Sequence, residues 1–134
     1  HNVEIFRELL KNDIPVVYGP MSSLDYKVEL HKASYKNVIP LMDSGVQFGL
    51  MTDHPVVLAH HLRDSLKYFL IQEMSPEKAI SLITFENARI LNLEDRLGTI
   101  ETGKDASLIV WNQDPFHLGA FPILVMAEGN IIRN

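Results

Sequence analysis

The chain has 134 residues, of which 46% are hydrophobic and 22% charged, with a formal net charge of −5. This composition is that of an ordinary globular protein, and the mixed, slightly acidic charge argues against a nucleic-acid-binding surface, which needs clustered basic residues. The absence of cysteine excludes disulfides, zinc fingers and thiol catalysis. No apolar run approaches the ~20 residues that cross a bilayer, and there is no secretory signal pattern. We therefore expect a cytoplasmic protein that binds neither nucleic acid nor membrane.

The first segment has the pattern of an amphipathic helix, because apolar residues recur at helical spacing through residues 3–10. The run Ile14–Tyr18 is apolar without alternation and stops at Gly19-Pro20, which predicts a strand buried on both faces. Pro15 is expected at the first position of this strand because it has no N–H group. The chain begins with His1 rather than Met and enters the helix at once, so we expect it to be cut from a longer protein.

The same helix–strand pattern then repeats. A polar loop leads into a helix over Tyr35–Met42, and the second apolar run, Val46–Met51, predicts a second buried strand. It ends at Thr52-Asp53-His54-Pro55. Alternating helices and buried strands imply a parallel sheet with helical cover. Two strands make a poor sheet, and an eight-stranded barrel takes roughly 250 residues. We therefore expect one end of a larger fold.

Two helical segments are predicted after the second strand. Leucine and phenylalanine side chains at helical spacing through residues 58–70 predict one long amphipathic helix. Ser75-Pro76-Glu77 is a typical helix start, with serine as the cap, proline in the first turn and glutamate at the positive dipole end. This helix and its continuation are expected to run to about Leu93.

From Leu97 onward the pattern predicts β structure. Ser107–Trp111 is a predicted strand. Two further apolar segments, Ile123–Ala127 and Ile131-Ile132, flank Glu128-Gly129-Asn130, which is a tight-turn sequence and predicts a hairpin.

Asp53 is the strongest candidate for a chemical role. It lies just past the C-terminal end of a predicted buried strand, where ligands and catalytic groups collect in parallel α/β folds. A carboxylate there can bind a divalent metal and accept a proton from its bound water. The alternative is that Asp53 caps a helix that starts near Pro55.

Other polar and aromatic residues have weaker signals. His60 and His61 are adjacent on a predicted helix, so their side chains are expected to diverge and not to chelate one ion together. His54 can touch substrate or simply lie in solvent. We expect Tyr18 to be packed rather than to line a pocket, and Trp111 to belong to the core rather than to a binding platform.

The chain resembles the amidohydrolase superfamily, particularly the branch near imidazolonepropionase. Met51–Pro55 is similar to the end of the eighth barrel strand in that superfamily, and Ile14–Pro20 to the seventh. Ala79–Leu93 with Leu97–Trp111, including Gly103-Lys104-Asp105-Ala106, resembles the passage in which barrel helices give way to a small β-sandwich. We expect Lys104 and Asp105 to be structural.

The resemblance implies an incomplete α/β fragment. Residues 1–93 would be the last two βα units of a TIM-type barrel, and residues 94–134 the C-terminal strands of a composite β-sandwich. The chain departs from the superfamily in Thr84-Phe85-Glu86-Asn87-Ala88, where members often have Thr-x-Asn-Pro-Ala. It departs again at Asn92 and Ser107, where Gly and Asp are common. We expect these differences to affect helix packing and the junction with the sandwich.

The resemblance also implies a function. The parent protein would be a metal-dependent hydrolase acting on a non-peptide C–N bond of a small molecule such as a cyclic amide. The cofactor would be a divalent metal, with zinc as the expected ion. Asp53 would be both a metal ligand and the catalytic acid–base. The His-x-His pair of the superfamily's metal site is absent from this sequence, so the chain alone is expected to be inactive.

Two interpretations in which the chain is not part of an enzyme remain open. The chain can be a non-catalytic fragment or interaction module that folds by self-association, because one carboxylate cannot hold a catalytic zinc, which takes about three protein ligands. It can also be an autonomous binding domain. In this fragment each of the two buried strands has at least one unpaired edge, and such edges recruit other chains, so we expect a homo-oligomer or an aggregation-prone chain.

Overall fold

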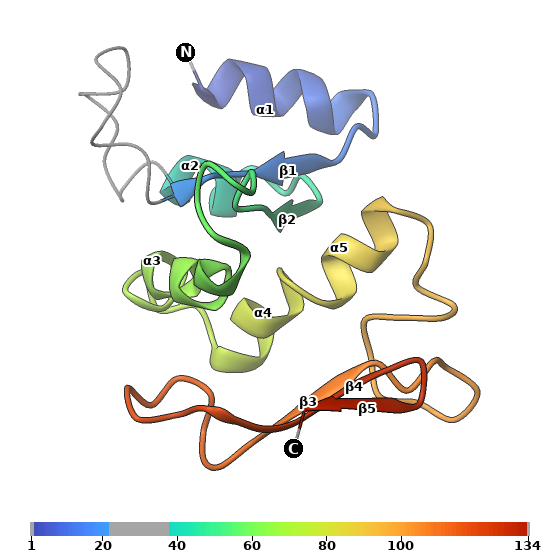
Figure 1. The fold of residues 1–134 in the computed structure, drawn as a ribbon. Helices are drawn as coiled ribbons and strands as arrows, with labels where there is room; N and C mark the ends of the chain where they lie inside the picture. The colour runs from blue at the N-terminus through green and yellow to red at the C-terminus, as the bar shows by residue number, and fades with distance from the viewer. Residues whose placement is uncertain (1, 22–37, 134) are drawn as a thin grey trace.

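Two separate sheets lie on either side of a helical layer (Figure 1) in the computed structural model, which describes residues 2–21 and 38–133. The elements in chain order are α1 (Asn2–Lys11), β1 (Val16–Tyr18), α2 (Val38–Asp43), β2 (Phe48–Leu50), the 3₁₀ turns η4 (Ala59–His61) and η5 (Arg63–Leu66), α3 (Lys67–Leu70), α4 (Pro76–Ser81), α5 (Phe85–Ile90), β3 (Leu108–Trp111), β4 (Pro122–Ala127) and β5 (Asn130–Arg133). Residues 35–37 of the predicted second helix lie outside the described residues.

The first sheet is a parallel pair, as the repeated helix–strand pattern predicts. β1 lies beside β2 with Val16 opposite Phe48 and Tyr18 opposite Leu50. All three residues of β2 are buried, but Val17 in β1 is 45% exposed. The prediction of burial on both faces is therefore correct for β2 and wrong for β1. Val17 therefore meets solvent, whereas Val16 and Tyr18 pack against the core.

The hydrophobic core lies between β2 and the helices that follow it. Leu50, Leu66 and Phe69 are almost completely buried, and the rings of Phe48 and Phe69 stack with centroids 5.7 Å apart. Tyr18 packs against this cluster from β1, which confirms its expected structural role. None of the residues of β3, β4 or β5 belongs to the cluster. The core is thus built by the β1–β2 half of the chain and the helical layer.

The predicted long helix over residues 58–70 is wrong. Two 3₁₀ turns, η4 and η5, precede the single turn of α3, and the amide of His61 bonds to the carbonyl of Leu58 three residues back rather than four. A 3₁₀ turn has about three residues, so the apolar stripe spaced for an α-helix rotates out of register. Leu66 and Phe69 still reach the core, but Leu58 is 47% exposed.

The predicted helix start at Ser75 is confirmed. The Ser75 hydroxyl accepts a hydrogen bond of 3.3 Å from the backbone N–H of Lys78, and Pro76 occupies the first turn of α4. The helix does not continue unbroken to Leu93, because α4 ends at Ser81 and α5 begins at Phe85. This break leaves the carbonyl group of Leu82 available to a partner outside the helix.

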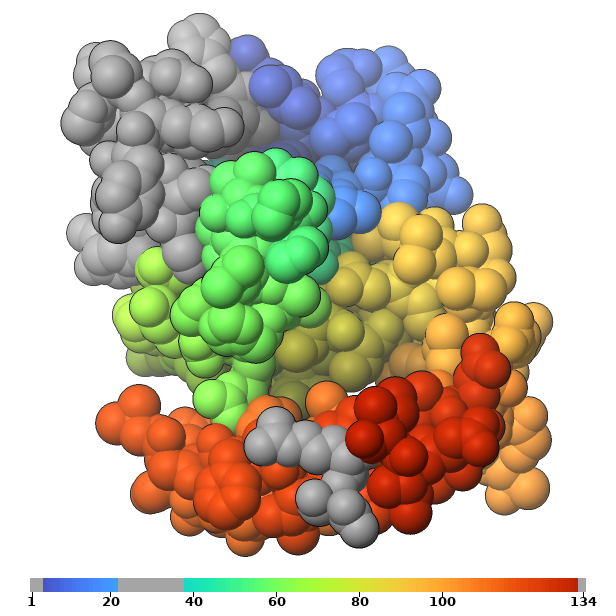
Figure 2. All heavy atoms as spheres, in the orientation of Figure 1, coloured from blue at the N-terminus to red at the C-terminus, as the bar shows by residue number. Residues whose placement is uncertain are grey.

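The second sheet is an antiparallel meander in the order β3-β4-β5. Glu128 and Gly129 both have positive φ angles, 50° and 80°, as a tight two-residue hairpin turn requires, so the predicted hairpin is confirmed. Figure 2 shows this sheet as a layer of its own along one side of the molecule. Within residues 2–21 and 38–133, no helix is long and apolar enough to cross a membrane.

The turns before β3 are held by the two residues expected to be structural. Asp105 forms a 2.6 Å ion pair with Arg96, and the Lys104 ammonium donates a 2.5 Å hydrogen bond to the Thr99 hydroxyl. These contacts fold residues 96–105 back on themselves before the chain enters the sheet. The division of the chain at residues 93 and 94 stays a prediction.

Candidate functional site at the end of β2

Asp53 lies in a tight turn after β2, separated from the last strand residue, Leu50, by Met51 and Thr52. Its backbone has a positive φ of 54°. The turn is closed by the N–H of Val56, which donates to the Asp53 carbonyl at 2.8 Å, and by the N–H of Val57, which donates to the Thr52 carbonyl at 3.3 Å. Thr52 is buried, whereas Asp53 is exposed. The turn thus presents the carboxylate at the end of the strand, as predicted.

The alternative role of Asp53 as a helix cap is wrong. Residues 53–56 form a turn, and the next helical element, η4, begins at Ala59 with Leu58 at its N-cap. With the residues that the structure describes, the Asp53 carboxylate forms neither a hydrogen bond nor an ion pair. The side chain is therefore available to a ligand.

The C-terminal end of β2, which we call the exit of β2, is hydrogen-bonded to β1 on one side. The N–H of Met51 donates a 3.1 Å hydrogen bond to the carbonyl of Tyr18. Gly19 follows with a φ of 145°, and a β-carbon there would lie 2.2 Å from the Met51 carbonyl oxygen. Only glycine tolerates both this conformation and this approach. Burial raises the pKa of the Tyr18 phenol above its usual value of 10.0, because the anion would lose its hydration.

On the other side, the exit of β2 is held by the helical layer. The N–H of Leu50 donates to the Leu82 carbonyl at 3.2 Å, and the Leu50 carbonyl accepts a 3.0 Å hydrogen bond from the Asn87 side chain. A β-carbon on Gly49 would lie 1.9 Å from Asn87 Oδ1. Asn87 belongs to the segment that departs from the superfamily pattern, but the sequence does not predict this contact, which joins residues far apart in the chain.

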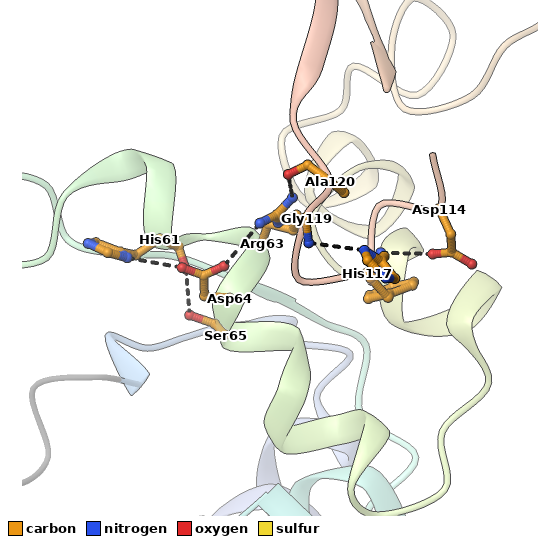
Figure 3. A network of polar contacts seen from close by, with 9 residues as sticks. His61, Arg63, Asp64, Ser65, Asp114, His117, Gly119 and Ala120 are labelled. Carbon is orange, nitrogen blue, oxygen red and sulfur yellow. Dashed lines mark hydrogen bonds and ion pairs between the residues drawn. The ribbon is translucent and has the colours of Figure 1, made fainter. Parts of the chain in front are cut away.

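The histidines near Asp53 do not gather around it. His54 is exposed, and His60 and His61 lie in η4 with their ring centroids 4.1 Å apart. The expectation that these two rings diverge is wrong, because they lie in a 3₁₀ turn and not in a regular α-helix. His61 Nδ1 lies 3.1 Å from Asp64 Oδ2 (Figure 3). Within the described residues no group of three or more His, Cys, Asp or Glu side chains could hold a metal ion.

Arg63 joins the helical layer to the C-terminal sheet (Figure 3). Its guanidinium donates to the Ala120 carbonyl at 3.3 Å and lies 4.7 Å from the centre of the Trp111 ring. Trp111 is half-buried beneath this cation but is not part of the core cluster, so the prediction that it belongs to the core is wrong. In the adjoining loop, the Gly119 N–H donates to His117 Nδ1 at 3.0 Å, and the Asp114 carbonyl accepts from the His117 N–H at 2.9 Å.

Comparisons with known proteins agree with this arrangement. The sequence profile of the Amidohydrolase family matches residues 6–132. A solved amidohydrolase from Thermotoga maritima superposes with a TM-score of 0.87 at 33% identity, over 97% of this chain and 34% of that chain. Amidohydrolase tasK of Hapsidospora irregularis is 30% identical over 104 residues, which are 78% of this chain and 11% of that protein. An imidazolonepropionase of Thermoplasma volcanium is 31% identical over 90 residues, which are 62% of this chain and 21% of that protein.

The family profile and the Thermotoga maritima structure cover nearly all of the chain, and the other two relatives cover 78% and 62% of it. The chain spans only a minor part of each relative, from 11% of one to 34% of another. The α/β arrangement of the described residues is that of one portion of a solved amidohydrolase. The resemblance to amidohydrolases, imidazolonepropionases among them, is confirmed. The chain belongs to the amidohydrolase family.

Proposed function

We propose that this chain is the C-terminal portion of a metal-dependent hydrolase that cleaves a non-peptide C–N bond in a small molecule such as a cyclic amide. The observation that carries the proposal is the position of Asp53, exposed and unpaired at the exit of a buried parallel strand. That end of a parallel strand is where catalytic groups collect in α/β barrels. Membership of the amidohydrolase family supports the reaction class.

The Asp53 carboxylate fits the requirements of a metal ligand. It is an oxygen donor with no bonding partner among the described residues, and a rigid strand carries the turn that presents it. Zinc, the expected ion, takes about three protein ligands at a catalytic site. Asp53 would supply one of them, and the other ligands would come from outside the described residues. Such an ion lowers the pKa of its bound water and polarises the substrate carbonyl.

In this proposal the carboxylate of Asp53 moves the proton. It accepts the proton that water releases as its oxygen bonds to the carbonyl carbon, and it then delivers that proton to the nitrogen as the C–N bond breaks. The turn at residues 53–57 serves this role because its two backbone hydrogen bonds hold the main chain of Asp53 at the end of the strand. A cytoplasmic location stays part of the proposal.

The test requires a complete enzyme. In a chimeric enzyme, residues 1–134 would replace the matching third of the Thermotoga maritima amidohydrolase. Asp53→Asn keeps the shape of the side chain but removes its charge and its proton acceptor. We expect turnover of a panel of cyclic amides to fall by several orders of magnitude, because metal binding and proton transfer fail together.

The matched control is Asp64→Asn, which neutralises another exposed carboxylate, bonded to His61 and Arg63. We expect this control to retain turnover within about a factor of two, since surface substitutions away from such features have small effects. Full turnover and unchanged zinc content in Asp53→Asn would remove Asp53 from the mechanism and with it the proposal.

A further inference from the structure

The last residue of β2 has no strand neighbour on its helical side, yet both of its backbone polar groups are bonded there. β2 pairs with β1 alone in the sheet formed by the described residues. On the opposite side the Leu50 N–H reaches the Leu82 carbonyl at 3.2 Å, and the Leu50 carbonyl accepts from Asn87 Nδ2 at 3.0 Å. The break between α4 and α5 and the side chain of Asn87 thus take the place of a neighbouring strand.

The fit between Asn87 and β2 is close and specific. Gly49 is buried, and its missing side chain is what lets the Asn87 amide reach the strand, because a β-carbon there would lie 1.9 Å from Asn87 Oδ1. The amide nitrogen donates to the Leu50 carbonyl, which an apolar or acidic side chain at this position could not do. The contact therefore depends on the residues that this chain carries at both positions.

The chain between this contact and Asp53 is held at each step. Met51 is bonded to Tyr18 through its N–H, and Thr52 is 7% exposed with its carbonyl bonded to the N–H of Val57. A displacement of Leu50 is thus passed on to Asp53 instead of being absorbed by a loose linker. We infer that Asn87 is a positioning residue that fixes the place of the Asp53 carboxylate, an inference that rests on the proposed function of Asp53.

The first test uses this chain and follows the two amides that close the Asp53 turn, those of Val56 and Val57, by hydrogen exchange. Asn87→Ala removes the contact, and Asn87→Asp keeps the shape but replaces the donor with an acceptor. For both we expect exchange at the two amides to accelerate about tenfold more than at Met74, whose N–H bonds to Phe69 in the core, because the turn loosens locally.

The control for a general loss of stability is Ser75→Ala. It removes the cap of α4 in the same helical layer, and among the described residues Ser75 has no hydrogen bond to β2. We expect it to accelerate Val56, Val57 and Met74 equally. If the Asn87 variants also accelerate exchange equally at Val56, Val57 and Met74, the positioning role is overturned and Asn87 contributes only to packing.

The second test separates this inference from the proposed function. In the chimeric enzyme, the dissociation constant for Zn²⁺ alone is measured by competition with a chelator. We expect Asn87→Asp to weaken binding by about 10–100-fold, as is usual for residues that orient a ligand. If Asp53→Asn weakens binding and Asn87→Asp does not, the positioning role is overturned alone. If Asp53→Asn leaves zinc binding unchanged, the proposed function is overturned, and the role of Asn87 toward the metal falls with it.

Discussion

The side-chain amide of Asn87 donates a 3.0 Å hydrogen bond to the backbone carbonyl of Leu50, 37 residues earlier in the chain. This bond ties α5 to the exit of β2, at the point where Gly49 leaves room for it. Because the bond is half-buried, removal of its donor leaves a carbonyl group without a partner away from bulk water. The stability of the strand end should therefore depend on Gly49 and Asn87 jointly.

We expect a double-mutant cycle to show this dependence. Asn87→Ala should lower the free energy of unfolding by about 1–3 kcal/mol, because the Leu50 carbonyl loses its donor. Gly49→Ala should cost about as much, because its β-carbon overlaps Asn87. The double variant should lose less than the sum, with a coupling of at least about 0.5 kcal/mol, since the β-carbon then enters space that Asn87 has left. Urea unfolding measures all four proteins, and simple additivity would contradict the steric argument.

Stability should fall at alkaline pH, in part because of Tyr18. Burial raises the pKa of its phenol in the folded state above 10.0, so the folded chain holds this proton more tightly than the unfolded chain does. The resulting stabilisation is present below about pH 10 and is lost as the pH rises through the folded-state pKa. We expect Tyr18→Phe to show a smaller drop in urea midpoint between about pH 9 and pH 11 than the wild-type chain. An equal drop would show that other groups cause the alkaline loss.

Arg63 should hold the C-terminal sheet against the helical layer. Arg63→Ala removes both the hydrogen bond to Ala120 and the cation over Trp111, and we expect faster hydrogen exchange or proteolysis in β3 and β4 with a loss of about 1 kcal/mol. Lys67→Ala is the control, because that cation lies over Tyr68, 5.0 Å from the ring centre, within the helical layer. If β3 and β4 are as well protected in Arg63→Ala as in the wild-type chain, other contacts hold the C-terminal sheet against the helical layer.

Self-association is the expected behaviour of the isolated chain. Exposed apolar side chains that gather on one surface favour association, because contact removes them from water. Large exposed side chains lie on both sheets, including Val17, Ile131 and Ile132. We propose that copies cover one another's apolar surfaces in a homo-oligomer.

Light scattering over a dilution series tests this proposal. The alternative interpretation, a non-catalytic module that folds by self-association, also requires that copies of the chain associate. We expect a mass above that of one chain at micromolar concentration. Val17→Lys places a charge on the first sheet, and Ile131→Lys places one on the C-terminal sheet. The variant that lowers the measured mass identifies the sheet that forms the contact between copies. A cooperatively unfolding monomer would instead favour an autonomous domain.

The chain alone should bind zinc only weakly. Within the described residues Asp53 belongs to no group of three or more side chains that could hold an ion, and a catalytic zinc takes about three protein ligands. We expect isothermal titration calorimetry to show no stoichiometric site of submicromolar affinity. Such a site would mean that the chain or its oligomer completes a metal centre.

The sequence by itself determined the features that depend on neighbouring residues. The hairpin turn at Glu128-Gly129, the cap at Ser75 and the buried strand before Asp53 follow from local backbone preferences and runs of apolar residues, and the structure confirms each of them. The family followed from motifs spread along the chain, and the matching profile confirms it. The metal and catalytic roles of Asp53 stay predictions.

Only the tertiary structure decided how the exit of β2 is held. The 3₁₀ turns at η4 and η5 replace a predicted α-helix, so Leu66 and Phe69 reach the core whereas Leu58 stays exposed, and the periodic pattern alone did not reveal this difference. The bond between Asn87 and Leu50 joins residues that no local rule relates. Such contacts depend on where the folded chain brings distant backbone groups together, so they become visible only once the strands and helices have packed.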